Sequence, residues 1–298
     1  DVLLKRVVNE GLLTAQSEQI PADAYIVCVP TPFKEAYKVD TKFINAAAEA
    51  MAPHLRPGAL VVLESTSPPG TTEAMAEHII SLRPDLSLDE NDENAIFIAH
   101  CPERVLPGQI MEEMENNDRV IGGLTPKGTK LACDLYGTFC TAELLKTNAT
   151  TAEMAKLTEN SFRDVNIAFA NELSLISDRL GIDVWELIEL ANHHPRVNIL
   201  QPGPGVGGHC IAVDPWFIVS SVPEEARIIK MARDVNDGKP EWVIGKVEKA
   251  LDGLESPVVA ALGIAFKNDI DDLRESPSLS IVKTLGEENP DLDIRVVE

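Results

Sequence analysis

The stretch Ala24-Tyr25-Ile26-Val27-Cys28-Val29-Pro30 is an almost unbroken apolar run that ends at a proline. A short run of this kind is typical of a strand that is covered on both faces, as in a parallel sheet. Thr31 and Pro32 follow it and mark the carboxyl end of the strand. The run therefore predicts an α/β fold that is built on a parallel sheet.

The same pattern extends outward from this run in both directions. Short apolar runs alternate with helical stretches from residue 11 to about residue 146. The runs that we interpret as strands are residues 12–15, 24–30, 59–63, 95–99, 119–121 and 142–146. Strands that alternate with helices predict a Rossmann-like domain with crossover helices.

A long helix is predicted from Thr150 to Leu180. Thr150 and Glu153 have the spacing of a capping box, and Gly181 provides the stop. Three polar residues share one face of this helix, namely Lys156, Asn160 and Arg163. Its apolar residues predict a core stripe formed by Met154, Leu157, Val165, Phe169, Leu173 and Ile176.

A second α/β unit is predicted near the end of the chain. A helical stretch at residues 224–251 precedes an apolar strand at 257–263, a helix at 278–285 and a strand at 294–297. The predicted domains are residues 1–147, a central helical domain at 148–250, and a second Rossmann-like domain at 251–298. Two strands are too few for a doubly wound sheet, and the first domain opens without a glycine-rich turn. We therefore expect a fragment of a longer protein.

The composition excludes several classes of protein. A formal net charge of −22 disfavours non-specific binding to nucleic acid or to an anionic membrane. The sequence contains no apolar run of membrane-spanning length and no signal peptide at its start. Its five cysteines include no C-x-x-C pair, which disfavours a disulfide scaffold and a zinc site. We expect a cytoplasmic protein with no metal site.

A glycine- and proline-rich segment, residues 201–215, carries Cys210 and, four positions later, Asp214. Glycines allow close approach of a ligand and prolines restrict the turns around them, so the segment suits a thiol held against a bound molecule. The alternative is a tight loop with a buried cysteine. Gly203, Gly205 and Gly208 also match G-x-G-x-x-G, but prolines and His209-Cys210 replace the required strand and helix.

Loops at the predicted carboxyl ends of strands supply further candidates, because open α/β sheets bind ligands there. They contain Thr31, Thr66, Thr72 and the pair Glu103-Arg104. The alternative for the threonines is turn and cap chemistry, and for the pair it is a solvated surface. A charged loop at residues 265–277 is a similar strand-end candidate.

On a helix considered alone, Lys156, Asn160 and Arg163 indicate a solvated face. The same residues become candidates for catalysis if a nucleophile lies beside them. A thiol that attacks a carbonyl needs oxyanion donors, which Lys156 and Asn160 could supply, and Asp214 could hold a water. Arg163 and Arg196 suit a diphosphate. The neighbouring His193 and His194 fit packing better than metal binding.

Several long motifs in a fixed order carry a resemblance that covers nearly the whole chain. They are Pro30-Thr31-Pro32, Glu64-Ser65-Thr66-Ser67-Pro68, and residues 101–108, 153–164, 203–215 and 265–277. In this order they resemble the UDP-glucose/GDP-mannose dehydrogenase family. The resemblance implies an NAD-binding domain, a central helical domain through which such enzymes form homodimers, and a UDP-sugar-binding domain.

The resemblance also implies a four-electron oxidation of a sugar C6 alcohol by NAD. Cys210 would capture the aldehyde as a thiohemiacetal that becomes a thioester. Lys156 and Asn160 would stabilise the oxyanion, Asp214 would assist the hydrolytic water, and Glu103 would be a further acid or base.

Contact residues follow from the same motifs, position by position. The resemblance implies cofactor contacts at Thr31, Thr66, Thr72 and Arg274. It implies substrate contacts at Arg104, Val105, Lys156, Asn160, Arg163, His194, Arg196, Gly207, Phe266 and Lys267, with Arg196 reaching a neighbouring subunit.

Arg104-Val105, Pro107 and His209 differ from the UDP-glucose enzymes of this family and favour an N-acetylated hexosamine. The expected substrate is UDP-N-acetyl-D-mannosamine, and the expected product is a uronate for a surface polysaccharide. UDP-glucose, UDP-N-acetylglucosamine and GDP-mannose remain alternatives. So does a catalytically dead binding module, because the family's glycine-rich pyrophosphate loop is missing from this sequence.

Overall fold

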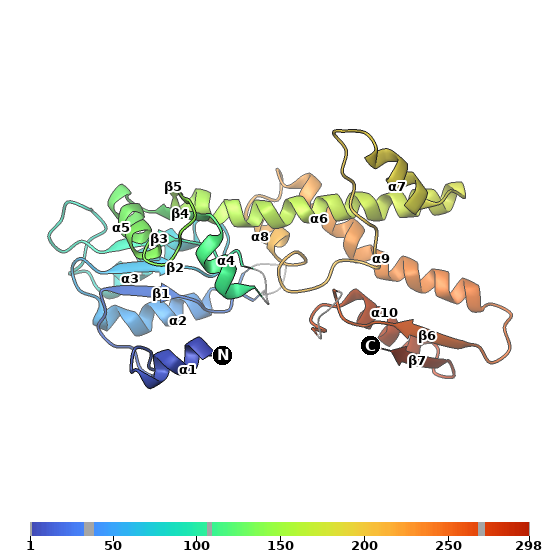
Figure 1. The fold of residues 1–298 in the computed structure, drawn as a ribbon, viewed down its shortest axis with the longest axis horizontal. Helices are drawn as coiled ribbons and strands as arrows, with labels where there is room; N and C mark the ends of the chain where they lie inside the picture. The colour runs from blue at the N-terminus through green and yellow to red at the C-terminus, as the bar shows by residue number, and fades with distance from the viewer. Residues whose placement is uncertain (1, 33–38, 106–108, 268–271, 298) are drawn as a thin grey trace. The chain divides into compact units, whose positions relative to one another are not determined.

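The computed structural model describes residues 2–32, 39–105, 109–267 and 272–297 (Figure 1). These residues form two compact units that divide after Glu153, and each unit is described by itself. The predicted division into three domains stays a prediction.

The first unit is built on a five-stranded sheet with strand order β1-β2-β3-β4-β5. The strands are β1 (Ala24–Val27), β2 (Leu60–Leu63), β3 (Phe97–His100), β4 (Arg119–Gly123) and β5 (Leu144–Asn148). All neighbours run parallel except β3 and β4, which pair antiparallel over two residue pairs. The predicted α/β fold is confirmed, and the sheet is mixed rather than wholly parallel.

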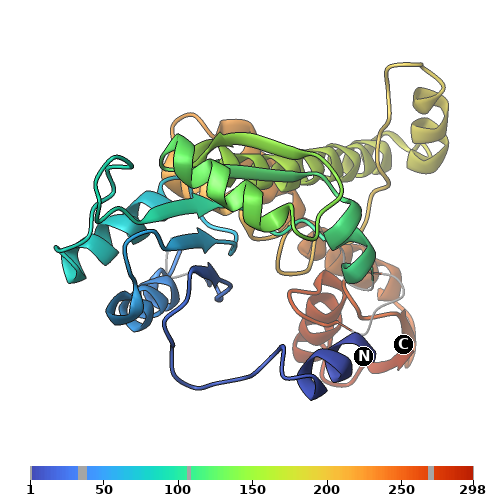
Figure 2. The same ribbon diagram turned by 60° about the vertical axis from the view of Figure 1, so that its left-hand side comes forward.

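Helices cover both faces of this sheet (Figures 1 and 2). Val61 and Leu63 pack with α2 (Lys42–Met51) and α3 (Thr71–Leu82), whereas Leu60 and Val62 pack with α5 (Pro126–Tyr136). Successive side chains of a strand point to opposite faces, so the all-apolar strand β2 is buried on both sides. The carboxyl ends of β1, β2 and β3 lie at one edge of the sheet, as parallel strands require.

Two sequence predictions in this unit are wrong. Residues 12–15 form no strand, because the N–H groups of Leu12 and Leu13 donate to the carbonyl of Val7 and complete the end of α1 (Val2–Asn9). The predicted capping box at Thr150 and Glu153 is also absent. Instead, Asn148 Oδ1 accepts from the N–H of Thr151 at 2.8 Å.

The carboxylate of Glu153 binds the N-terminus of another helix. It accepts hydrogen bonds from the N–H of Gly70 at 2.6 Å, the N–H of Thr72 at 2.7 Å and the hydroxyl of Thr72 at 2.6 Å. Glu153 is therefore the cap of α3, reached across the fold, and it ties α3 to the first turn of α6 (Ala149–Leu180).

The second unit contains most of α6 together with α7 (Val184–Asn192), α8 (Asp214–Ser221) and α9 (Arg227–Leu251). The buried side of α6 is polar over much of its length and includes Asn160, Ser161, Asp164, Asn171, Ser174 and Ser177. Helix α9 supplies buried Arg233, Asn236 and Lys239 as partners.

The predicted core stripe of α6 is confirmed only in part. Leu157 is fully buried and Met154, Val165 and Leu173 are half-buried, but Phe169 is 50% exposed and Ile176 is 46% exposed. Hydrogen bonds and ion pairs from α9 compensate the burial of polar groups on α6, and among the described residues Phe169 and Ile176 stay exposed.

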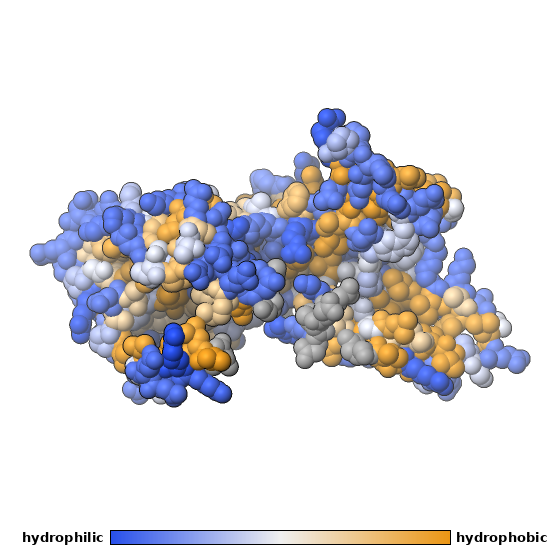
Figure 3. All heavy atoms as spheres, in the orientation of Figure 1, coloured by the Kyte–Doolittle hydropathy of each residue, from blue (hydrophilic) through white to orange (hydrophobic). Residues whose placement is uncertain are grey.

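The rest of the second unit is a small α/β arrangement. Strands β6 (Val258–Leu262) and β7 (Asp293–Val297) pair in parallel, and α10 (Pro277–Glu288) connects them and packs on α9. The two predicted strands and the helix between them are confirmed. Apolar side chains remain exposed on the strands, with Leu262 81% exposed, and Figure 3 shows such residues over β6 and β7.

Glu153→Gln should lower the free energy of unfolding by about 1–3 kcal/mol, because the new amide group must turn an N–H donor toward a backbone N–H of α3. Glu172→Gln, on an exposed position of the same helix, should change it by less than about 0.5 kcal/mol. Urea denaturation of both variants measures the difference. Equal stability of the two variants would contradict the cap.

Candidate functional site

The loop that carries Cys210 is held by close backbone contacts with the segment before α10. The N–H of Gly208 donates to the carbonyl of Arg274 at 3.2 Å. A Cβ on Gly207 would lie 2.5 Å from the carbonyl oxygen of Glu275, and Gly208 has a φ of +80° beneath the Phe266 ring. Only glycine lets the backbone come so close to Glu275 and Phe266, so these two glycines allow the loop to pack against the segment before α10.

Cys210 lies at the start of a turn that leads into α8. Its carbonyl accepts from the N–H of Asp214 at 2.8 Å, which fixes the cysteine and the aspartate within one turn. The carboxylate of Asp214 is buried and accepts a hydrogen bond from Asn160 Nδ2 at 2.6 Å. The structure thus brings together Cys210, Asp214 and Asn160 from segments far apart in the sequence.

Charges around the thiol and the carboxylate act in opposite directions. Burial raises the pKa of the Cys210 thiol and Asp214 raises it further, whereas the cationic groups of Lys156, Arg274 and Arg163 lower it. Burial raises the pKa of Asp214 to about 6, against the hydrogen bond from Asn160 and the charge of Lys156, which lower it. Cys210 is nevertheless accessible to solvent and is not in a disulfide.

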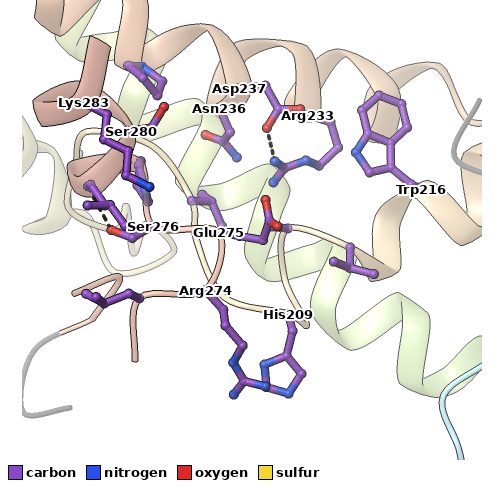
Figure 4. Close-up of a pocket in the computed structure, with 17 residues that line it drawn as sticks. His209, Trp216, Arg233, Asn236, Asp237, Arg274, Glu275, Ser276, Ser280 and Lys283 are labelled. Carbon is purple, nitrogen blue, oxygen red and sulfur yellow. Dashed lines mark hydrogen bonds and ion pairs between the residues drawn. The ribbon is translucent and has the colours of Figure 1, made fainter. Parts of the chain in front are cut away.

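A cavity of about 780 Å³ adjoins this loop. Its walls come from the cysteine loop, α8, α9, residues 273–277 and α10. Figure 4 shows Arg233, Asn236 and Asp237 on one side and His209 and Arg274 on the other. The lining is of mixed character, with cationic Arg233, Arg274 and Lys283, the carboxylates of Asp237 and Glu275, and apolar side chains such as Trp216. Such a cavity suits a polar molecule.

The predicted substrate residues of the C-terminal segment lie at this loop. Phe266 packs its ring on Gly208, and Lys267 is exposed. Arg274 is exposed and forms an ion pair with Asp272 at 2.6 Å, which lowers the pKa of Asp272 to about 2. Part of the predicted loop, residues 268–271, lies outside the described residues.

Three predicted diphosphate and sugar residues are exposed, namely Arg163 on α6 and His194 and Arg196 beyond α7. The N–H of Arg196 donates to Nδ1 of His194 at 3.3 Å. Arg163 is close enough to Cys210 for its charge to lower the pKa of the thiol.

In the first unit, Glu103 is turned back on its own loop. Its Oε1 accepts from the N–H of Arg104 at 2.6 Å and from the N–H of Val105 at 2.7 Å. The guanidinium of Arg104 donates to the carbonyl of Asp118 at 2.9 Å. Pro107, which entered the prediction of the sugar, lies outside the described residues.

The predicted cofactor residues of this unit have different surroundings. The Thr31 hydroxyl donates to the carbonyl of Thr66 at 2.8 Å, which links the carboxyl ends of β1 and β2. Thr72 is fully buried, and its hydroxyl donates to the Glu153 carboxylate that caps α3. Its side chain therefore serves the structure of this helix end. Ser67 is 1% exposed, and its hydroxyl has no hydrogen-bond partner among the described residues.

Sequence reasoning missed a polar network at the same strand ends. The Glu64 carboxylate accepts from the Cys28 thiol at 3.1 Å and from the Tyr136 hydroxyl at 3.2 Å, and it lies 3.7 Å from Arg119. Arg119 also lies 3.9 Å from Glu103. The signal was available, because Glu64 follows a predicted strand directly, but its partner Arg119 comes from a strand whose direction was predicted wrongly.

Within the described parts of the chain, no helix is both long and apolar enough to cross a membrane. Across the same residues, His, Cys, Asp and Glu side chains form no cluster suited to a metal ion.

Family models match three successive parts of the chain. Residues 1–140 match the NAD-binding domain of the UDP-glucose/GDP-mannose dehydrogenase family, residues 150–238 its central domain and residues 260–296 its UDP-binding domain.

Curated relatives and solved structures agree with these matches. The chain is 56% identical to an NDP-N-acetyl-D-galactosaminuronic acid dehydrogenase of Ralstonia nicotianae, over 96% of this chain and 68% of the relative. It is 57% identical to a UDP-N-acetyl-D-mannosamine dehydrogenase of Campylobacter jejuni, over 100% and 74%. A UDP-D-ManNAc dehydrogenase structure from Pyrococcus horikoshii matches with a TM-score of 0.89 and 40% identity, over 98% and 70%.

These matches confirm the fold and the expectation of a dehydrogenase that uses NAD. The chain belongs to the UDP-glucose/GDP-mannose dehydrogenase family.

Proposed function

We propose that this protein oxidises UDP-N-acetyl-D-mannosamine to UDP-N-acetyl-D-mannosaminuronate, with two NAD reduced per sugar. The main support is the accessible Cys210 thiol, which lies one turn before the buried carboxylate of Asp214. This carboxylate accepts a hydrogen bond from Asn160 Nδ2 at 2.6 Å. The identity of 55–57% to several UDP-N-acetyl-D-mannosamine dehydrogenases supports the sugar.

A second sugar deserves the same test. Two Ralstonia relatives named for N-acetyl-D-galactosaminuronic acid are 56% identical to this chain, so UDP-N-acetylgalactosamine is the second candidate. Both substrates carry an N-acetyl group, which agrees with the departure from the UDP-glucose enzymes at Arg104-Val105. UDP-glucose, UDP-N-acetylglucosamine and GDP-mannose should be poorer substrates.

The first unit fits NAD at the carboxyl ends of β1 and β2. The unpartnered Ser67 hydroxyl there, beside Thr66, is a buried polar group that a bound ligand would satisfy. Thr31 and Thr66 would hold the cofactor with it, and Arg274 is a further proposed contact. Thr72 would act indirectly, through the cap on α3. When bound, NAD accepts one hydride in each of the two oxidations.

Cys210 would hold the sugar between these oxidations. The first removes a hydride and a proton from the C6 alcohol and gives an aldehyde. The Cys210 sulfur then adds to the aldehyde carbon and forms a thiohemiacetal. Loss of the second hydride, with the hydroxyl proton, gives a thioester. Water adds to the thioester and releases the carboxylate and the free thiol.

The surrounding residues have separate tasks in these steps. The Lys156 ammonium and the Asn160 amide can donate to the oxyanion of the tetrahedral intermediates. The Asp214 carboxylate, kept in place by Asn160, would accept a proton from the attacking water. Glu103 remains a proposed acid or base, and its turned-back carboxylate must rotate away from residues 104 and 105 for that role.

Binding of the nucleotide sugar would involve the exposed groups around the loop. Arg163, His194 and Arg196 are proposed contacts to the diphosphate and the sugar, with Lys267 beside them. Phe266 and Gly207 would shape the floor of the site, since they pack directly against each other. Arg104 and Val105 are proposed to line the sugar.

The product would enter a surface polysaccharide, such as the enterobacterial common antigen, and the enzyme would act in the cytoplasm. The Salmonella, Yersinia and Escherichia relatives at 55–57% identity are named for oxidation of the same sugar nucleotide, UDP-N-acetyl-D-mannosamine.

We propose that two copies pair through the exposed apolar stripe of α6. Phe162 is 68% exposed, Phe169 50%, Ile176 46% and Leu180 68%. The first three are seven residues apart and share one helix face. A second copy of α6 has the complementary stripe, as a symmetric helix pair requires.

Cys210→Ser should lower NADH formation from UDP-N-acetyl-D-mannosamine by about 10³-fold or more, because a serine hydroxyl is a far weaker nucleophile toward the aldehyde. Cys140→Ser, at a buried thiol that bonds a carbonyl, should retain activity. Stopped-flow absorbance at 340 nm measures both. Two NADH per sugar from Cys210→Ser at the normal rate would refute the covalent route.

Asp214 should impose an acid limb on the turnover rate. Its pKa is raised to about 6, so protonation below that pH removes the base and the rate should fall about tenfold per pH unit. Asp214→Asn should be about 10²-fold slower and lack the limb, whereas Asp234→Asn on α9 should keep it. A wild-type rate that stays constant from pH 8 to pH 5 would exclude this role.

Phe169→Glu should weaken the dimer by at least about tenfold, because it buries a charge in the apolar stripe. Glu172→Gln, three residues further on α6, should not. Sedimentation velocity over a concentration series measures both. The same monomer–dimer equilibrium in both variants would place the interface elsewhere.

A further inference from the structure

A second cavity lies in the helical unit, separate from the one beside His209 and Arg274. Its volume is about 400 Å³, and it is bounded by α6, the start of α7, residues 202–204 and α9. Cys210 and the residues around it do not line this cavity. None of the residues proposed for catalysis, cofactor binding or substrate binding lines it.

A buried lysine with an incomplete set of partners lies in its wall. Lys239 is 3% exposed, and its ammonium donates to the Ser174 hydroxyl at 2.5 Å and lies 4.0 Å from the centre of the Trp242 ring. Among the described residues no carboxylate lies within ion-pair distance of it. An ammonium carries three donors, so two of its N–H groups remain to be satisfied. Asp178 acts on Lys239 from a distance and raises its pKa, but burial lowers this pKa more strongly. A buried cation without a counter-ion in direct contact is costly, and an anion in the cavity would reduce that cost.

The other charged groups of the cavity are already engaged. Asp178 pairs with Lys246 at 2.5 Å. The Asp183 carboxylate accepts from the N–H groups of Trp185 and Glu186 at the start of α7. Both carboxylates thus have partners of their own, and among the described residues that line the cavity Lys239 is the one lysine or arginine.

A second polar group and an apolar wall complete the site. Ser177 lines the cavity, is 1% exposed, and its hydroxyl has no hydrogen-bond partner among the described residues. Most of the remaining wall is apolar and flat, with Trp185, Trp242, Pro202 and Pro204. This combination suits a molecule with one anionic group and a flat apolar body.

We propose that this cavity binds a small aromatic or cyclic carboxylate, with the carboxylate on Lys239 and Ser177 and the ring between the tryptophan and proline side chains. Residues 202–204 belong to the loop that carries Cys210, and Asn171 on α6 accepts from the N–H of Gly203 at 2.8 Å. A ligand in the cavity therefore touches the base of the catalytic loop without touching the thiol.

Benzoate and its neutral isostere benzamide are the probes, added to the full chain without NAD or sugar. Two of the three tryptophans line the cavity, so tryptophan fluorescence reports occupancy. At pH 7 benzoate should bind with a dissociation constant of about 1–10 mM and at least about tenfold more tightly than benzamide. Equal affinities of the two probes, or no binding of benzoate, would overturn the assignment.

Variants identify the cation. Lys239→Met should remove the preference for benzoate, Lys239→Arg should keep it, and Lys230→Met, an exposed lysine of the same helix, should behave as wild type. A folded Lys239→Met that retains the tenfold preference would overturn the assignment.

The pH dependence gives a readout that does not need a variant. Burial lowers the pKa of Lys239 to about 8, so the wild-type preference for benzoate should decline between pH 7 and pH 9. Lys239→Arg should keep its preference over this range. The other charged groups among the described residues that line the cavity are Asp178 and Asp183, and Lys246 is the ion-pair partner of Asp178. An undiminished wild-type preference at pH 9 would contradict the role of Lys239.

Discussion

The buried ion pair between Asp164 on α6 and Arg233 on α9 holds the second unit together. Its atoms are 2.6 Å apart, and both side chains are at most 1% exposed. Asn236 also donates to Asp164, at 2.8 Å, and accepts from Asn171. Removal of one partner from such a buried pair typically costs about 3–5 kcal/mol. The pair links α6, which carries Lys156 and Asn160, to the helix on which the loop that carries Cys210 and α10 pack.

Placement of the thiol depends on this helix pair through close backbone contacts. A Cβ on Gly205 would lie 2.9 Å from Pro277 and 3.3 Å from the carbonyl of Asn236, so the loop rests on α9 and α10 together. The turn after Cys210 then delivers Asp214 to Asn160, which is itself carried by α6. The proposed nucleophile, base and amide donor thus derive their geometry from one polar helix contact and a few glycines.

Patterns within short stretches of sequence predicted the strands and the loop that carries Cys210, because these features depend on neighbouring residues. Five of the six strands predicted in the first unit and both in the second exist, because each is an apolar run between turn residues. Cys210 and Asp214 were found because their loop has an unusual composition. One failure was local, because residues 12–15 complete the end of α1 instead of forming a strand. The others concern partners distant in sequence: Glu153 caps α3 rather than its own helix, and Phe169 is exposed while α9 bonds to the polar side of α6. No spacing rule within one helix reveals which face another helix will cover.

In the proposed mechanism, Cys210 carries the sugar as a thioester that Asp214 helps water to cleave. Intact-protein and peptide mass spectrometry of Asp214→Asn, quenched during turnover with NAD and UDP-N-acetyl-D-mannosamine, tests it directly. Slow hydrolysis should let an adduct of the sugar nucleotide accumulate on the peptide that contains Cys210. Full turnover to the uronate with no adduct at any time, or an adduct on a different residue, would contradict the account.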